Sequence, residues 1–247
     1  MAFGGGGFSM ESGNPLLDEY VLGLCGPERP RVCFLPSASG DADHYIVRFY
    51  RAFPGERCEA SHISFFRREQ GPADVRRHLL SQDLIYVGGG SVVSLLGVWR
   101  AHGLDVILRE AWEAGVILCG LSAGSLCWFA EAVSGFHGAP RRVEGLGLLP
   151  FSNCVHYERR SKRRDAYCGF LREGMPGGYA AEDGAALHFV GTSLSRVVAS
   201  RPEARGYRLD VAGKSVVEMQ IATTYLGENA TTTTLPVPEA LSTAIAA

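Results

Sequence analysis

The chain has 247 residues, of which 46% are hydrophobic and 20% are charged, and its formal net charge is −2. This length suits one large domain or two small ones and is sufficient to bury a full core. The near-neutral charge argues against a strongly basic nucleic-acid binder and against an acidic disordered chain. No apolar stretch reaches the roughly 18 residues of a membrane span, so no membrane partner is expected.

The cysteine count and the first residues of the chain bear on its compartment. There are 7 cysteines, an odd number, and no two of them have C-x-x-C spacing. A disulfide framework or a zinc ribbon is therefore not expected, and no metal site is predicted. The segment from Met1 to Met10 has neither a basic start nor a long apolar run, so it does not resemble a signal peptide. We therefore predict a reduced, cytoplasmic protein.

Short apolar runs alternate with helical patterns along the first half of the chain. Strands are predicted at 31–35, 58–66, 83–87 and 116–119, and helices at 43–53, 74–80, 92–100 and 104–114. Ser91 can cap the helix that ends at Arg100. This alternation predicts an α/β fold with a mostly parallel, doubly wound sheet that helices cover on both faces.

The second half of the chain has a different pattern. A further helix is predicted at 125–131, followed by an apolar segment at 148–155. Short strands joined by turns are expected at 185–190, 196–199, 206–211 and 215–221, where they would form a small antiparallel extension. We expect one domain over residues 1–230 and a frayed, low-complexity tail over 231–247.

The 31 glycines are unusually many, and several of them gather at predicted strand ends. The first cluster, Gly4 to Gly7, follows a very short strand. We interpret it as a strand-to-helix turn in preference to a loop that approaches a ligand. The second cluster, Gly88 to Gly90, leads into a helix. Its amides could donate to developing negative charge, or the cluster could be only a tight turn.

The third cluster is Gly120-Leu121-Ser122-Ala123-Gly124, which fits the pattern G-x-S-x-G. It lies between a predicted strand and a predicted helix, which is the context of a nucleophile elbow. A serine on such a sharp turn takes strained backbone angles and therefore needs small neighbours. We predict that Ser122 is a nucleophile whose hydroxyl lies at a helix N-terminus.

A serine nucleophile needs a base, and His156 is the best candidate among the 7 histidines. It follows the apolar segment 148–155, so it should lie at the same sheet edge as Ser122. His137 lies in a glycine-bounded loop, and its role stays open. Glu182 and Asp183 offer adjacent carboxylates after His156, one of which could orient the imidazole. Their spacing alone favours a solvated turn.

Several of these motifs together resemble the peptidase E (aspartyl dipeptidase) family of serine peptidases, which includes cyanophycinase. The resemblance rests on four segments: Gly88-Gly89-Gly90, Gly120 to Ser125, Cys154-Val155-His156-Tyr157 and Ala181 to Leu187. It implies a three-layer α/β fold related to class I glutamine amidotransferase domains, and a cofactor-free hydrolase. It also implies Ser122 as nucleophile, His156 as base, and Asp183 as acid with Glu182 as the second choice. The amides of Gly89, Gly90 and Ala123 would supply or flank the oxyanion hole.

Two departures from the family pattern affect the expected substrate. Ser91 stands where the family's glycine loop usually continues with Asn, and 133–136 lacks an Asp that many relatives carry. The aspartyl preference is therefore open. The basic run after His156 could bind a substrate carboxylate or could be a solvated helix face. The predicted substrate-binding residues are Ser91, Tyr157, Arg163 and Arg164.

These observations predict a serine exopeptidase that acts on short peptides through an acyl-enzyme. The partner is the peptide substrate, and a homodimer is an open alternative for the assembly. A peptide- or partner-binding relative without activity and a glutamine amidotransferase-like enzyme are the alternatives. The serine at position 122 argues against the latter, since that scaffold uses cysteine at the elbow.

Overall fold

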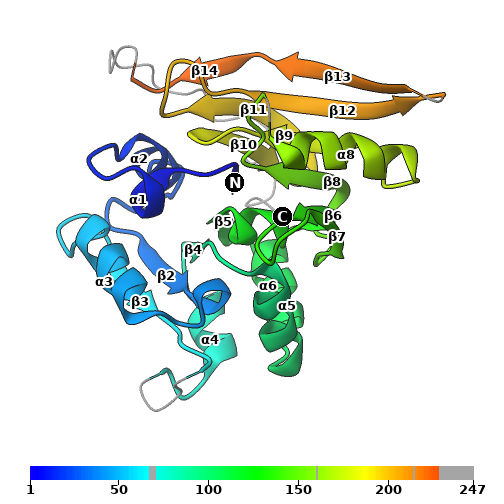
Figure 1. The fold of residues 1–247 in the computed structure, drawn as a ribbon. Helices are drawn as coiled ribbons and strands as arrows, with labels where there is room; N and C mark the ends of the chain where they lie inside the picture. Colours follow the sequence, from blue (N-terminus) through cyan, green and yellow to red (C-terminus); the bar gives the residue numbers. More distant parts are fainter. Residues whose placement is uncertain (67–70, 160, 214, 228–247) are drawn as a thin grey trace, which may run out of the picture.

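The computed structural model describes residues 1–66, 71–159, 161–213 and 215–227 (Figure 1). Within these residues the chain forms an 8-stranded and a 6-stranded sheet. The first sheet has the spatial order β14 (Thr223–Tyr225), β11 (Ser193–Ala199), β10 (Ala185–Val190), β1 (Ala2–Phe3), β5 (Ile117–Leu121), β4 (Leu84–Val87), β2 (Arg31–Leu35) and β3 (Glu59–His62). The second has the order β13 (Ser215–Ile221), β12 (Gly206–Ala212), β9 (Gly178–Ala181), β8 (Leu149–Val155), β6 (Phe129–Ser134) and β7 (Arg141–Glu144).

The helices connect and cover these strands. They are α1 (Gly7–Met10), α2 (Leu16–Leu22), α3 (Asp43–Ala52), α4 (Val75–Leu80), α5 (Val92–Ala101), α6 (Leu104–Glu113), α7 (Ala123–Leu126) and α8 (Lys162–Arg172), with a short 3₁₀ turn at Ser37–Ser39. In the first sheet β1, β5, β4, β2 and β3 run parallel, and β10 adds to β1 in the antiparallel direction. The carboxyl ends of the parallel strands therefore meet at one edge.

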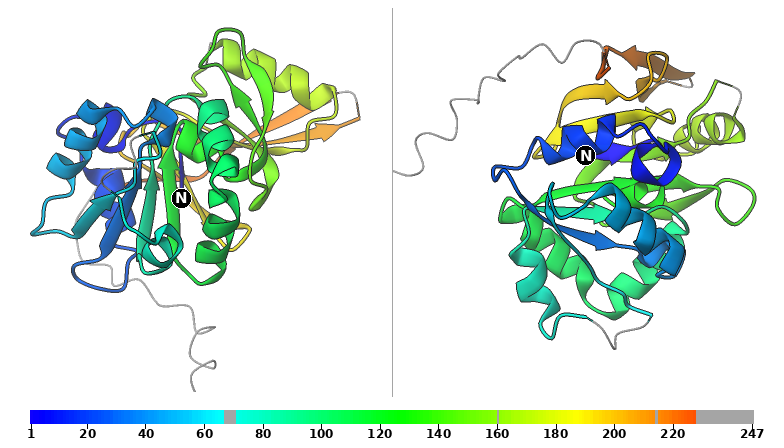
Figure 2. Two further views of the ribbon diagram at one scale, coloured as in Figure 1. Left: turned by 90° about the horizontal axis from the view of Figure 1, so that it is seen from below. Right: turned by 90° about the vertical axis from the view of Figure 1, so that its left-hand side faces the viewer.

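Alternating residues of the central strands face two different layers of helices. Val32 and Phe34 of β2 are fully buried in a cluster with residues of α2 and α3. Cys33 and Leu35 are buried in a cluster with residues of α4, α5 and α6. The first sheet thus lies between two helical layers, as the further views of the ribbon illustrate (Figure 2). The predicted α/β class is confirmed.

The second sheet differs from the predicted small extension. Only β10, β11 and β14 extend the first sheet, whereas β12 and β13 join β6 to β9 in a sheet of their own. The helix α8 covers one face of this sheet, and the β12–β13 hairpin reaches beyond the body of the molecule (Figure 1). The predicted tail at 231–247 lies outside the described residues.

The prediction of a helix at 125–131 is wrong. The α7 helix ends at Leu126, and residues from Phe129 onward form β6. Phe129 pairs with Leu149 of β8, and Ala132 pairs with Val143 of β7. Strand partners that are distant in sequence therefore override the local helical pattern.

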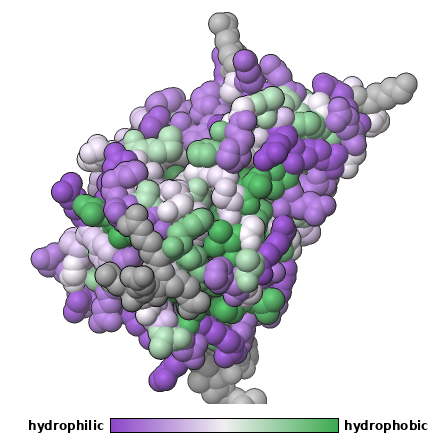
Figure 3. Space-filling view, turned by 60° about the horizontal axis from the view of Figure 1, so that its bottom comes forward, coloured by the Kyte–Doolittle hydropathy of each residue, from purple (hydrophilic) through white to green (hydrophobic). Residues whose placement is uncertain are grey.

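Apolar side chains also reach the surface. Figure 3 shows them gathered in a band across one face, with polar side chains around it. A separate observation is a cavity of 720 Å³ lined mainly by apolar residues, among them Trp112 and Trp128. Its lining includes Ile117, the first residue of β5, whereas Ser122 follows the last residue of that strand. This cavity is therefore distinct from the candidate active site.

The carboxyl group of Asp18 on α2 is buried in the core, and only 2% of the residue is exposed. Burial raises its pKa to about 7, although the Tyr86 hydroxyl donates a hydrogen bond to it at 3.0 Å. Because the folded-state pKa exceeds the unfolded value, the stability linked to this group is complete below about pH 4 and is lost as the pH rises through about 7.

We therefore expect Asp18→Asn to raise the free energy of unfolding at about pH 8 by roughly 2–4 kcal/mol and to change it little at about pH 4. The reason is that an uncharged amide avoids the cost of an ionised, buried carboxylate. Urea unfolding followed by circular dichroism at both pH values measures the difference. An equal change at the two pH values would contradict this account.

Candidate active site

Ser122 occupies a sharp turn between β5 and α7. Its backbone angles, φ 53° and ψ −113°, are unfavourable for a residue with a side chain. The turn is tight, since a Cβ atom on Gly120 would lie 2.3 Å from the Gly124 carbonyl oxygen. A Cβ on Gly124 would lie 2.3 Å from the carbonyl oxygen of Val87. Both glycines of the G-x-S-x-G pattern are therefore required by close backbone approach, as the predicted nucleophile elbow demands.

His156 follows the last residue of β8 and faces Ser122. Its Nε2 atom lies 2.9 Å from the Ser122 Oγ atom. His156 has a positive φ of 52°, and its backbone amide donates to the carbonyl oxygen of Gly4 at 3.2 Å. This unusual backbone conformation lets the ring turn toward the end of β5.

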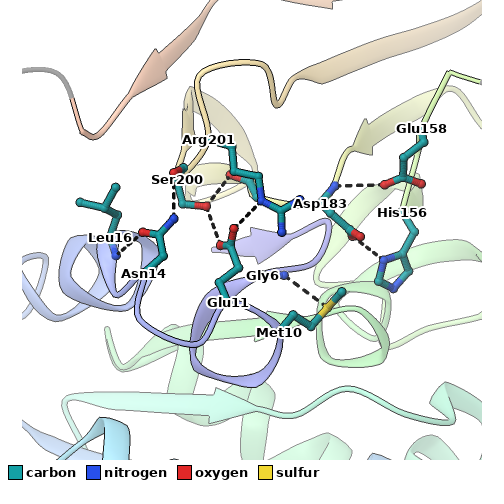
Figure 4. Close-up of polar contacts among 11 residues, drawn as sticks. Gly6, Met10, Glu11, Asn14, Leu16, His156, Glu158, Asp183, Ser200 and Arg201 are labelled. Carbon is teal, nitrogen blue, oxygen red and sulfur yellow. Dashed lines mark hydrogen bonds and ion pairs between the residues drawn. The ribbon is translucent and has the colours of Figure 1, made fainter.

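Asp183 lies on the other side of the imidazole, in the turn after β9. Its Oδ1 atom lies 2.5 Å from His156 Nδ1 (Figure 4). An ionised carboxylate only accepts hydrogen bonds, so Nδ1 donates to Asp183 and Nε2 is left to accept the proton of Ser122. Ser122, His156 and Asp183 thus form one continuous chain of hydrogen bonds.

Gly5, in the N-terminal glycine run, packs against the His156–Asp183 pair. Gly184 donates its amide to the carbonyl oxygen of Gly5 at 3.1 Å, which holds the turn that carries Asp183. A Cβ atom on Gly5 would lie 2.0 Å from Asp183 Oδ1 and 3.1 Å from the His156 ring. The segment is the strand-to-helix turn that we favoured from the sequence, because it joins β1 to α1. Its contact with the His156–Asp183 pair was not predicted.

A polar cluster of Glu11, Ser200 and the partly exposed Arg201 supports the same turn (Figure 4). Glu11 accepts hydrogen bonds from Ser200 Oγ at 2.6 Å and from Arg201 Nε at 2.5 Å. Ser200 in turn donates its amide to the carbonyl oxygen of Gly184 at 2.8 Å. The arrangement fixes the backbone next to Asp183, and the position of that carboxylate therefore depends on residues from both ends of the chain.

Glu182 does not contact the imidazole, which corrects its predicted place as second choice for the acid. Its carboxylate accepts from the Arg205 amide at 2.9 Å and from the Tyr207 hydroxyl at 2.8 Å. Successive residues at a strand end point in opposite directions, so only one of two adjacent carboxylates can face His156. That one is Asp183.

Two backbone amides near Ser122 are free to bind an oxyanion. Within the described residues, no acceptor pairs with the amides of Gly90 and Ala123. Gly90 has φ 139°, and a Cβ there would lie 2.2 Å from the Ala38 carbonyl oxygen, so only glycine fits. The amide of Gly89 is not available for this role, because it donates to the Tyr45 hydroxyl at 3.0 Å.

A pocket of 480 Å³ opens beside His156. Lys162 and Arg163 at the start of α8 line it, together with Glu158. No ion pair involves these three side chains among the residues that the structure describes. A Cβ on Gly135 would lie 2.9 Å from Arg163 Nε, so the missing side chain leaves room for the guanidinium group. The pocket can therefore receive a substrate carboxylate.

Two other predicted substrate-binding residues are directed elsewhere. Tyr157 is fully buried, and its hydroxyl donates to Glu218 Oε2 at 2.6 Å. Burial raises the pKa of this tyrosine. Arg164 pairs with the same Glu218 and stacks over the rings of Tyr157 and Tyr207 at 4.9 and 5.2 Å. Both residues hold α8 against the second sheet, and their predicted contact with substrate is corrected.

Ser91 directly follows Gly90, but its hydroxyl is already occupied. As predicted, it caps α5, accepting from the Ser94 amide at 3.2 Å. The same oxygen lies 2.8 Å from His137 Nε2. Ser91 is 4% exposed, so its predicted role as a direct substrate ligand is not supported by its surroundings.

Comparison with known proteins identifies the family. A model of peptidase family S51 matches residues 1–197. The chain belongs to this family. A curated relative, "Uncharacterized peptidase YgaJ" of Bacillus subtilis (strain 168), is 45% identical over 228 residues, which cover 92% of this chain and 98% of the relative. The crystal structure of a peptidase from an acI-B1 Actinobacterium shares the fold, with a TM-score of 0.62 at 17% identity, covering 90% of this chain and 92% of the other.

The family confirms the resemblance seen in the sequence, and the protein is a peptidase of the peptidase E-like serine type. In the described part of this S51 peptidase, no helix has the length and apolarity of a membrane span. The cytoplasmic location and the homodimer stay predictions.

Proposed function

We propose that this S51 peptidase is a serine exopeptidase that hydrolyses short peptides through an acyl-enzyme. The observation that carries the proposal is the series of two hydrogen-bond contacts that joins three groups. Ser122 Oγ lies 2.9 Å from His156 Nε2, and His156 Nδ1 lies 2.5 Å from Asp183 Oδ1. These are the contacts that activate a serine for attack on a carbonyl carbon.

In the proposed mechanism, Ser122 Oγ bonds to the scissile carbonyl carbon while its proton moves to His156 Nε2. Asp183 holds the ring in the required tautomer and stabilises the imidazolium that forms. The amides of Gly90 and Ala123 donate to the oxyanion. The tetrahedral intermediate expels the amine, which takes the proton from His156. Water then attacks the acyl-enzyme with His156 as base, and Ser122 is regenerated.

The charges of the neighbouring pocket support action on the ends of short peptides. A dipeptide carries a charged group within a few bonds of its scissile carbonyl, whereas an internal peptide bond does not. Lys162 and Arg163 offer two cations and Glu158 offers one anion beside His156. We propose that Arg163, which can bind a carboxylate through two parallel hydrogen bonds, anchors the substrate carboxylate.

A library of free dipeptides, digested and read by mass spectrometry, tests the activity and its preference. We expect cleavage of dipeptides and little cleavage of the same sequences placed inside longer, blocked peptides. Cleavage of blocked internal sequences at equal rates would contradict an exopeptidase. An absence of all cleavage would contradict the proposed function itself.

Arg163→Met is expected to raise KM for the preferred dipeptides about 10- to 100-fold, with a smaller effect on kcat, because a charged hydrogen-bond partner is lost. Steady-state kinetics on the best substrates from the library measure both constants. Arg159→Met is the matched control, since Arg159 is an exposed member of the same basic run and does not line the pocket. Equal KM values for the Arg163 and Arg159 variants would contradict the anchoring role.

The buried thiols give no support to the glutamine amidotransferase alternative. Cys119 and Cys127, the cysteines nearest Ser122 in sequence, are both fully buried. Burial raises the pKa of each thiol well above its ordinary value. A protonated, inaccessible thiol is a poor nucleophile, so Ser122 is the better candidate. The intact contacts of His156 likewise favour an active enzyme over a degenerate relative.

A further inference from the structure

The loop between β6 and β7, residues 135–140, contacts the start of α5. His137 Nε2 in this loop lies 2.8 Å from Ser91 Oγ. Ser91 is the residue after Gly90, whose amide is free for the oxyanion. The loop is therefore joined to the chain next to the proposed oxyanion hole by one side-chain hydrogen bond.

The hydrogen bonds of Ser91 determine that His137 Nε2 is the acceptor in this contact. The Ser91 oxygen accepts from the Ser94 amide at 3.2 Å and from the Ser94 hydroxyl at 2.9 Å. These two donors occupy both lone pairs of the oxygen, so the Ser91 proton is directed to His137 Nε2. His137 accepts this hydrogen bond only while its Nε2 atom carries no proton, which requires the neutral ring.

The same loop forms a wall of the pocket beside His156. Gly135, Gly138, Ala139 and Pro140 line this pocket together with Lys162 and Arg163 of α8. The loop thus touches the oxyanion side of the site through His137 and the substrate pocket through its other residues. Loss of the hydrogen bond between His137 and Ser91 would leave this wall of the pocket unanchored.

We propose that His137 is a positioning residue that fastens the 135–140 loop over the substrate pocket, so that its bond to Ser91 sets the affinity for peptide. This inference rests on the proposed exopeptidase function. His137 touches neither the nucleophile nor the base, and its loss affects KM more than kcat.

The test compares His137→Ala and His137→Gln with the wild type in steady-state peptide hydrolysis at one fixed pH. We expect His137→Ala to raise KM about 10-fold at pH 8 and to change kcat less than about threefold. His137→Gln can still accept from Ser91 and is expected to restore KM to within about threefold of the wild type.

Two further measurements separate this inference from the proposed function. Ser94→Ala removes the other hydroxyl on Ser91 but keeps the His137 contact, so its KM should stay within about twofold of the wild type. A small fluorophosphonate should label Ser122 at wild-type rate in His137→Ala, since the triad is untouched. Absence of labelling in the wild type would overturn the proposed function. Normal labelling with an unchanged KM in His137→Ala, or with a KM in His137→Gln as high as that in His137→Ala, would overturn the role of His137.

Discussion

Ser122→Ala is expected to lower kcat for dipeptide hydrolysis by about 10⁴- to 10⁶-fold while the protein stays folded. The substitution removes the atom that attacks the carbonyl, and within the described residues no other hydroxyl lies within hydrogen-bond distance of His156 Nε2. The strained backbone at position 122 tolerates alanine as well as serine, so a loss of stability does not explain the loss of activity. Product formation by mass spectrometry over long incubation gives the range needed.

Ser125→Ala is the control for this variant. Ser125 lies three residues further on, and its hydroxyl accepts from Asn153 Nδ2 at 3.0 Å without contacting His156. We expect it to retain activity within about 10-fold and to lose about 1 kcal/mol of stability. If Ser122→Ala kept more than a trace of activity, or if Ser125→Ala lost as much, Ser122 could not be the nucleophile.

Asp183→Asn is expected to reduce kcat about 10³- to 10⁴-fold. An asparagine amide can donate to Nδ1, which then carries no proton, so Nε2 becomes protonated and cannot accept the proton of Ser122. The ring keeps its place, and KM is expected to change little. Steady-state kinetics on one dipeptide measures both kcat and KM.

Glu182→Gln is the matched control, because it removes the adjacent carboxylate that faces Arg205 and Tyr207. Its hydrogen-bond partners are structural, so we expect kcat within about fivefold of the wild type. The reverse ranking, with the larger loss in Glu182→Gln, would show that the orienting acid had been assigned to the wrong residue.

The parts of the site that depend on local chain geometry could be predicted from the sequence. The turn at Ser122 needs glycines at 120 and 124 for steric reasons, and both stand in the motif. His156 lies beside Ser122 as predicted, but it follows β8 of the second sheet and does not share the edge of the first sheet that was expected to bring the two together. The choice between Asp183 and Glu182 was open at first, since it depends on which side of a strand end faces the ring. The resemblance ranked Asp183 first.

The parts that depend on distant packing could not be predicted. Tyr157 and Arg164 turn away from the pocket because Glu218 of β13 receives them both. No local pattern links residues that are about 60 positions apart. Gly5 is a partial exception, since a glycine run that follows a strand at the active edge of the sheet is a signal for close backbone approach. That signal could have directed attention to the His156–Asp183 pair.

Packing between distant parts of the chain also explains β6, the strand that forms where a helix was predicted after α7. The segment 129–133 contains no turn residue that would end a helix, so its local pattern is compatible with a helix. Pairing with β8 and β7 makes it a strand instead. The consequence for the site is large, because β6 leads directly into the 135–140 loop. The loop that lines the proposed substrate pocket therefore follows directly on the strand that the sequence pattern had assigned in part as a helix.

Labelling with a fluorophosphonate probe, followed by peptide mapping, tests the central claim most directly. The account predicts stoichiometric modification of Ser122 in the wild type and no detectable modification in His156→Ala, with a strongly reduced rate in Asp183→Asn. Modification of any other residue, or undiminished labelling of Ser122 in His156→Ala, would contradict it.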